Sequence, residues 1–120
     1  PNLQANCAVN QALVLETGGT ARVVELDWLW SADVQQSALE PTPQADIAVG
    51  ADIIYVPEHA RPLLLTAFRF AKELVVVQNV HRAGTAAFLS AAADMDLEVQ
   101  RHKLERAEYE LWHVKPRTMP

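Results

Sequence analysis

The sequence has few of the features that would cross-link the chain or carry it through a membrane. Its 120 residues include a single cysteine, Cys7, which excludes an internal disulfide and is typical of a reducing compartment such as the cytoplasm. No apolar run approaches the roughly 18 residues of a membrane span. We therefore expect a cytoplasmic protein with no membrane partner.

Positive charge and catalytic motifs are also scarce. Ten Lys and Arg against fifteen Asp and Glu give a formal net charge of −5, which argues against a protein that coats nucleic acid, because neutralising phosphates requires clustered basic residues. Neither a Gly-x-Ser-x-Gly motif nor a Gly-rich phosphate loop is present, so hydrolase and kinase activities have no support. The histidines have no cysteine or carboxylate at ligand spacing, so we expect no metal site. They are His59, His81, His102 and His113.

The chain does carry enough apolar residues for one packed domain. Half of its residues are hydrophobic, and a chain of this length buries about two-thirds of its unfolded surface. Residues 45–58 begin as a short, nearly unbroken apolar run, which is typical of a strand covered on both faces. Asp52 and Tyr55 follow at its carboxyl end, where open α/β sheets place their ligand crevice.

The other stretches alternate between helix and strand patterns. Helices are predicted at residues 1–15 and 84–95 and between Pro57 and Ala71; strands are predicted at 21–28, 73–80, 97–104 and 109–115. Residues 30–44 read as a connection with room for one short helix, and they include Pro41 and Pro43. The short link before the last strand favours an antiparallel pair. The order predicts an α/β sheet that is parallel first and antiparallel at the end.

Two local features refine this outline. The run from Leu74 to Val77 predicts a second strand that is fully buried. Thr85 is the predicted cap of the Ala-rich helix that follows.

Two of the predicted strand ends together resemble one enzyme family. Leu26-Asp27-Trp28 closes one strand, and residues 51–55, Ala-Asp-Ile-Ile-Tyr, close the next. This pair resembles the seven-β-strand, S-adenosylmethionine-dependent protein-lysine methyltransferases, the group with a Leu-Asp-Trp segment and an Asp-x-x-Tyr motif. Asn6 and Asn10 in the first helix are similar to an Asn-x-x-x-Asn helix of that family.

The resemblance implies a Rossmann-like seven-strand sheet, mostly parallel with an antiparallel carboxyl-terminal hairpin. The family's Gly-rich first turn and the acidic end of its second strand have no counterpart here. We therefore expect residues 1–120 to be the carboxyl-terminal portion of a single methyltransferase domain with its first strands missing, and poorly stable alone because strand edges are left unpaired. Arg82, Thr85 and Phe88 look closest to the branch that modifies elongation factor 2.

The resemblance also implies roles for five residues. Asp52 would orient the substrate lysine through a charge-assisted hydrogen bond, and Tyr55 would wall the lysine channel. Asp27 would accept a hydrogen bond from the adenine amine, and Trp28 would provide a flat apolar face. Ala51 would leave space beneath the donor. The cofactor would be S-adenosylmethionine, without a metal, and the partner a protein substrate such as a translation factor or chaperone.

Other interpretations of the same residues stay open. Asp52 also suits a helix cap or a pair with Arg61, and Tyr55 and Trp28 also suit core packing. A small basic cluster near the last hairpin suits either an acidic substrate or a solvated strand face; it consists of Arg101, Lys103 and Arg106. The alternative functions are a truncated, non-catalytic partner-binding module, a nicotinamide-dependent enzyme, and a methyltransferase of small molecules or nucleic acid.

Overall fold

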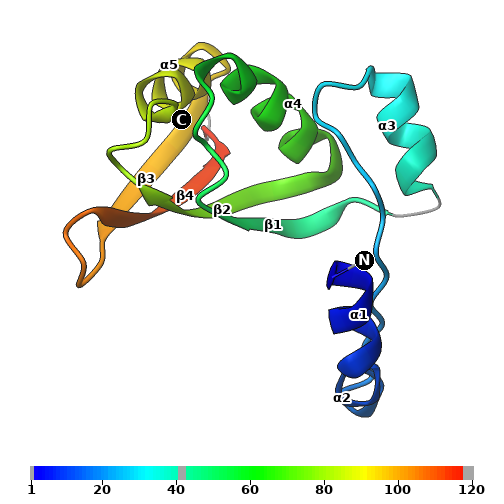
Figure 1. The fold of residues 1–120 in the computed structure, drawn as a ribbon. Helices are drawn as coiled ribbons and strands as arrows, with labels where there is room; N and C mark the ends of the chain where they lie inside the picture. The colour runs from blue at the N-terminus through cyan, green and yellow to red at the C-terminus, as the bar shows by residue number, and fades with distance from the viewer. Residues whose placement is uncertain (1, 41–42, 118–120) are drawn as a thin grey trace.

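Four strands form one mixed sheet in the computed structural model, which describes residues 2–40 and 43–117 (Figure 1). The strands are β1 (Ala45–Ala51), β2 (Ala71–Asn79), β3 (Leu97–Lys103) and β4 (Tyr109–Pro116), in the spatial order β1-β2-β4-β3. β1 and β2 are parallel, whereas β4 is antiparallel to both of its neighbours. Pro1 and Pro41, which fall within predicted segments, lie outside the described residues.

This sheet corrects the predicted architecture. The expected seven-strand, mostly parallel Rossmann-like sheet is wrong for the described residues, which form four strands with one parallel and two antiparallel neighbour pairs. The predicted strand at 21–28 is an irregular segment instead. Its apolar pattern suits a strand, but a strand requires a hydrogen-bonded neighbour, and no described segment provides one. The predicted antiparallel pair at the carboxyl end is present as β3 and β4.

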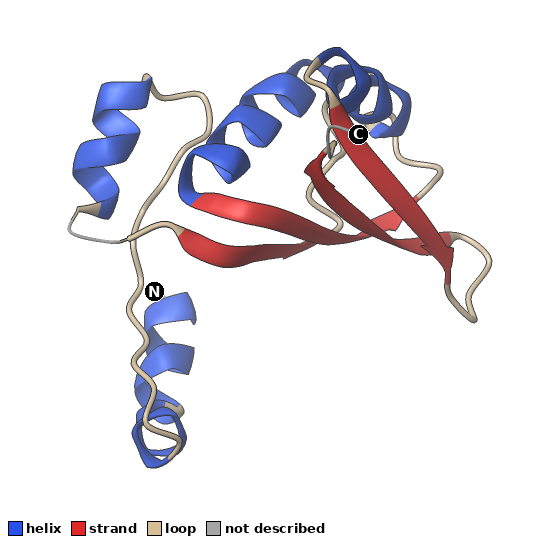
Figure 2. Ribbon diagram, turned by 180° about the vertical axis from the view of Figure 1, so that it is seen from behind, coloured by secondary structure: helices blue, strands red, loops and turns tan. Residues whose placement is uncertain are grey.

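The hydrophobic core lies between the sheet and two helices on one of its faces. Figure 2 shows α4 (Ala60–Phe70) and α5 (Thr85–Asp94) on the same side of the strands. Because side chains alternate along a strand, Leu74 and Val76 of β2 point to this side and are buried. Trp112 of β4 pairs with Val76 and packs against Phe88 of α5, with ring centroids 5.5 Å apart.

The two covering helices begin differently from one another. A short 3-10 turn, Pro57–His59, leads into α4, and Pro62 sits in its first turn, where a proline costs no intrahelical hydrogen bond. For α5 the prediction of a Thr85 cap is wrong: Gly84 holds the cap position, and the Thr85 hydroxyl is buried without a partner. A Cβ on Gly84 would lie 3.1 Å from the Ile54 backbone. A glycine therefore allows the start of α5 to lie close to the loop after β1.

The opposite face of the sheet has no covering helix among the described residues (Figures 1 and 2). Ile47 and Val49 of β1 are 49% and 77% exposed, and Val75 and Val77 of β2 are only half-buried. The expectations of a β1 covered on both faces and of a fully buried β2 are therefore wrong. Both strands have the apolar composition of a central strand, but only one of their faces is packed.

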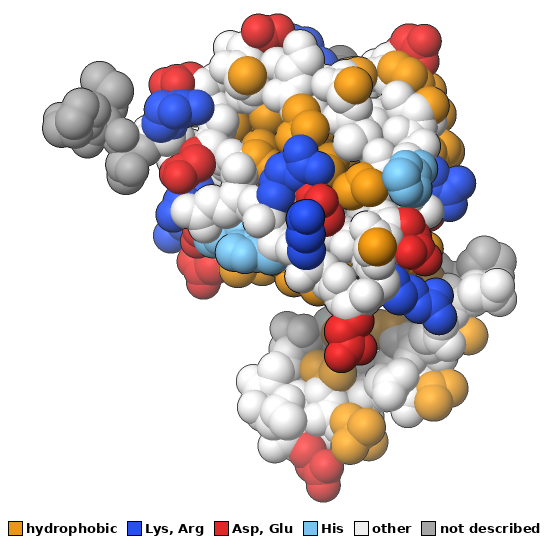
Figure 3. Space-filling view, turned by 90° about the vertical axis from the view of Figure 1, so that its left-hand side faces the viewer, with side chains coloured by type: hydrophobic (Ala, Val, Ile, Leu, Met, Phe, Trp, Pro, Cys, Tyr) orange, Lys and Arg blue, Asp and Glu red, His pale blue; other side chains and the backbone are white. Residues whose placement is uncertain are grey.

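The predicted amino-terminal helix is divided into α1 (Asn2–Val9) and α2 (Gln11–Glu16), which extend away from the sheet as an arm. Neither helix buries a residue, and Figure 3 shows hydrophobic side chains at the surface of the arm. The predicted short helix in the following connection is present as α3 (Ala32–Leu39), capped by the Ser31 side chain. Within the described residues, no helix combines the length and the apolar character needed to cross a membrane.

Candidate functional site

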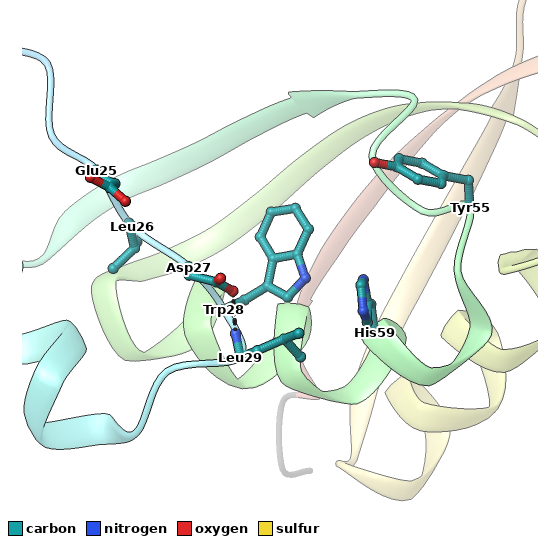
Figure 4. Close-up of a pocket in the computed structure, with 7 residues that line it drawn as sticks. All are labelled: Glu25, Leu26, Asp27, Trp28, Leu29, Tyr55 and His59. Atoms are coloured by element: carbon teal, nitrogen blue, oxygen red, sulfur yellow. Dashed lines mark hydrogen bonds between the residues drawn. The ribbon is translucent and has the colours of Figure 1, made fainter.

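An open pocket of about 370 Å³ lies where the irregular segment before α3 passes the loop that follows β1 (Figure 4). Its lining comes from two separate parts of the chain: Glu25, Leu26, Asp27, Trp28 and Leu29 from the first, and Tyr55 and His59 from the second. Three of the five predicted site residues, Asp27, Trp28 and Tyr55, are thus brought together here.

A buried glutamine holds the first wall of this pocket in place. Gln35 of α3 is fully buried, and its Nε2 donates hydrogen bonds to the Asp27 carbonyl at 3.0 Å and to the Thr66 hydroxyl at 2.8 Å. Its Oε1 accepts a hydrogen bond from the Arg69 guanidinium. These contacts join α3, α4 and the irregular segment, so side-chain bonds replace the strand ladder that the segment lacks.

Asp27 adopts a local turn that displays its carboxylate. Its Oδ1 accepts a hydrogen bond from the Leu29 N–H at 2.8 Å, and its carbonyl accepts one from the Trp30 N–H at 3.1 Å. An aspartate that bonds the backbone two residues ahead in this way stabilises a turn. An ionised carboxylate has about four acceptor positions, so Asp27 keeps capacity for a ligand donor at the pocket wall.

The aromatic side chains give the pocket a flat apolar surface. The Trp28 ring is half-buried, packs against the hydrophobic core, and meets the His59 ring edge-on, with centroids 6.4 Å apart and planes at 68°. The Tyr55 ring is exposed, and its hydroxyl points toward the space beside Trp28 (Figure 4). A flat face next to carboxylate acceptors suits a planar heterocycle that carries a hydrogen-bond donor.

Asp52 and Ala51 do not line this pocket. Asp52 follows β1 with a left-handed backbone (φ 51°), while its N–H still donates to the Val77 carbonyl at 2.7 Å. Its carboxylate accepts three contacts from Arg82, of 3.1 and 3.2 Å from Nε and 2.6 Å from Nη2. The hydrogen bond from Arg82 is the main reason that the pKa of Asp52 is lowered.

The arginine that pairs with Asp52 is therefore Arg82, and the alternative of a pair with Arg61 is wrong. Ala51 is exposed at the end of the edge strand β1, where it pairs with Val77. The five predicted site residues are divided between the pocket and the end of β1.

Several residues at the site were not identified from the sequence. The sequence marks His59 only as a possible metal ligand, whereas its place after Pro57 puts it in the turn that enters α4. Gln35 gave no signal, because a lone polar residue in a short helix is ordinary. Among the described residues, no group of three or more His, Cys, Asp or Glu is placed to hold a metal ion.

The basic cluster near the hairpin is partly engaged within the sheet. The Nε of Arg101 contacts Glu110 Oε1 at 2.6 Å, and its guanidinium lies 5.4 Å from the centroid of the Trp112 ring. Glu110 also accepts a hydrogen bond from the Trp112 indole at 3.0 Å. Arg101 therefore stabilises the β3–β4 pair. This favours reading the basic cluster as a solvated strand face and not as a substrate-binding site.

Comparison with known proteins does not add to this geometry: no protein-family model matches the chain, and no curated protein matches it significantly. The pocket and the β1 end together carry three carboxylates, a flat aromatic wall and a phenol; the carboxylates are those of Glu25, Asp27 and Asp52.

Proposed function

We propose that this chain takes part in S-adenosylmethionine-dependent methyl transfer to a lysine side chain of a protein. The observation that carries the proposal is the meeting of Asp27, Trp28 and Tyr55 in one pocket, although Tyr55 is remote from the other two in sequence. The resemblance of the Leu-Asp-Trp and Asp-x-x-Tyr segments supports the same activity.

The pocket residues fit the nucleoside part of this cofactor. The exposed carboxylate of Asp27 retains acceptor positions for an exocyclic amine, and the Trp28 indole offers a flat face on which a heterocycle can stack. The side chain of Glu25 adds a second carboxylate to the lining, which suits a ligand that carries a positive charge. S-adenosylmethionine, when bound, supplies a methyl group on a cationic sulfonium.

The chain's own residues would act on the lysine amine. An ordinary lysine has a pKa near 10.4, so a neutral amine at pH 7 costs roughly 4–5 kcal/mol. Asp52 would hold the amine in line for transfer through a charge-assisted hydrogen bond to its carboxylate. The proton that the amine loses would pass to solvent, which reaches the 31% exposed Asp52 side chain. Tyr55, three residues later and at the pocket, would contact the aliphatic part of the lysine with its ring and exclude water.

Calorimetric titration of S-adenosylmethionine into the 120-residue chain tests the donor site. We expect Trp28→Ala to weaken binding by about five- to 140-fold, because stacking of a base on an aromatic side chain contributes about 1–3 kcal/mol and 1.4 kcal/mol corresponds to a factor of ten. Trp30→Ala is the matched control, because Trp30 lines a different depression, beside Pro62 and Arg69. Failure of the unaltered chain to bind the cofactor would remove the donor-site proposal.

Transfer itself is tested with isotopically labelled donor and purified elongation factor 2 as the acceptor. We expect Asp52→Ala to abolish incorporation while the affinity for the donor is retained, since Asp52 lies outside the pocket. Full incorporation by Asp52→Ala would exclude Asp52 from the reaction.

The alternative, a non-catalytic partner-binding module, is favoured by one specific observation. The edge strand β1 exposes Ile47 and Val49 on the face of the sheet that no described helix covers. Exposed apolar groups beside unpaired backbone are typical of surfaces that bind another chain. Absence of cofactor binding, together with a protein partner that protects β1 from hydrogen exchange, would establish this alternative in place of methyl transfer.

A further inference from the structure

The contact between Asp52 and Arg82 brings together two loops that are distant in sequence. It joins residues that are 30 positions apart, and two guanidinium nitrogens of Arg82 contact both carboxylate oxygens. A paired geometry of this kind is stronger and more directional than a single ion pair. It places a cation on the carboxylate that methyl transfer would use to bind a lysine.

The backbone at Asp52 and at Arg82 holds the carboxylate and the guanidinium facing each other. Asp52 has a positive φ of 51°, which a non-glycine residue adopts at a cost, and its N–H bond to Val77 keeps it attached to β2. Arg82 lies between two consecutive turns, because its N–H donates to the Asn79 carbonyl and its own carbonyl accepts from the Thr85 N–H, both at 3.1 Å. The loop after β2 therefore holds the guanidinium at the end of β1.

The contact is nevertheless open to solvent. The side chains of Arg82 and Asp52 are 49% and 31% exposed, so the pair loses much of its strength to hydration and another cation can reach it. A fully buried ion pair would instead be costly to separate. Strong geometry combined with access to solvent is the property expected of a contact that is exchanged.

We infer that Arg82 is an internal competitor for the substrate: its guanidinium occupies the Asp52 carboxylate, and a cationic side chain of a partner protein must displace it to bind there. This inference rests on the proposed function for the identity of the cation as a lysine. The exchange involves no covalent step, since one positively charged donor replaces another on the same oxygens. Arg82 then sets the affinity for the substrate rather than the rate of the chemical step.

The test compares Arg82→Gln with Arg61→Gln, which removes the same charge from an exposed position of α4. Both variants are titrated with a short poly-lysine peptide, and binding is followed by fluorescence anisotropy without any cofactor. Because both have the same net charge, non-specific attraction is matched. We expect Arg82→Gln to bind the peptide about two- to fivefold more tightly than Arg61→Gln, the range that an exposed ion pair provides.

The difference must also disappear when Asp52 is changed. In the Asp52→Asn background the two glutamine variants should bind the peptide equally. Equal affinities in the original background, or weaker binding by Arg82→Gln, would overturn the inference; the second result would assign Arg82 to positioning Asp52. The measurement needs no methyl transfer, so failure of the proposed function and failure of the competitor role give separate results. If transfer occurs, Arg82→Gln should lower KM and leave kcat unchanged.

Discussion

Replacing Gln35 with alanine should release α3 and the pocket wall without unfolding the sheet. Gln35 is the only buried residue of α3, so it is the main side chain that docks this helix. It is also the residue that binds the Asp27 carbonyl and the Thr66 hydroxyl. Its loss therefore removes the hydrogen bonds that join the Asp27 backbone to α3 and α4, while Trp28 keeps its packing against the core.

The size of the effect follows from which groups are left without a partner. The Asp27 carbonyl keeps the hydrogen bond from the Trp30 N–H, and the half-buried Arg69 can be hydrated. The Thr66 hydroxyl is buried and loses its partner, which costs about 1–3 kcal/mol. We expect undocking to become easier by about 2 kcal/mol within that range, or roughly 30-fold, since 1.4 kcal/mol corresponds to a factor of ten.

Residue-resolved amide hydrogen exchange measures this local opening. The probes are the Gln35 N–H, which bonds to the Ser31 carbonyl, and the Trp30 N–H. Gln36→Ala is the matched control, because Gln36 lies beside Gln35 in the same helix and is exposed. Equal exchange in the two variants would refute the reasoning. Faster exchange throughout β2 would do the same, because it would make Gln35 part of the main core.

Three further predictions concern β4, the start of α5 and the β1 edge. Glu110→Gln should make the free energy of unfolding less dependent on pH in acid. The hydrogen bond from Arg101 lowers the pKa of Glu110 in the folded protein. The ionised Glu110 therefore stabilises the fold fully above the pKa of an ordinary glutamate, about 4.3, and this stabilisation is lost as the pH falls through the lower pKa of the folded state. Acid unfolding followed by circular dichroism checks this, and identical curves would contradict it. Gly84→Ala should lower the free energy of unfolding by about 1–3 kcal/mol, because its Cβ would meet Ile54 at 3.1 Å; an unchanged urea midpoint would count against it. Val49→Lys should reduce self-association through the exposed β1 edge, and sedimentation of an unaltered chain that is wholly monomeric would disprove this.

The helices and strands with a local hydrophobic signal were predictable from the sequence. The spacing of Leu63, Leu64 and Phe68 gives α4 its buried side, and these residues do pack in the core. The β3–β4 pair followed from a link too short for any other connection. In each case the information lies within a few residues of the element itself.

Features that depend on distant partners were predicted wrongly or were missed. Residues 21–28 have a strand pattern, yet only a neighbouring strand could make them one. The choice between Arg61 and Arg82 as the partner of Asp52 depends on the left-handed turn at Asp52 and on the loop that follows β2. Neither the register of a ladder nor the direction of a side chain after such a turn is encoded by local periodicity.

The two halves of the candidate site are held by different kinds of contact. The pocket wall at Asp27 depends on Gln35, a fully buried amide that bonds to the Asp27 carbonyl and to the buried Thr66 hydroxyl. The carboxylate of Asp52 depends on a solvent-accessible guanidinium, Arg82, which can leave at little cost. A site that binds a cofactor on the first half and a protein side chain on the second would require this difference, because the cofactor surface has to be preformed whereas the protein surface has to open for its substrate.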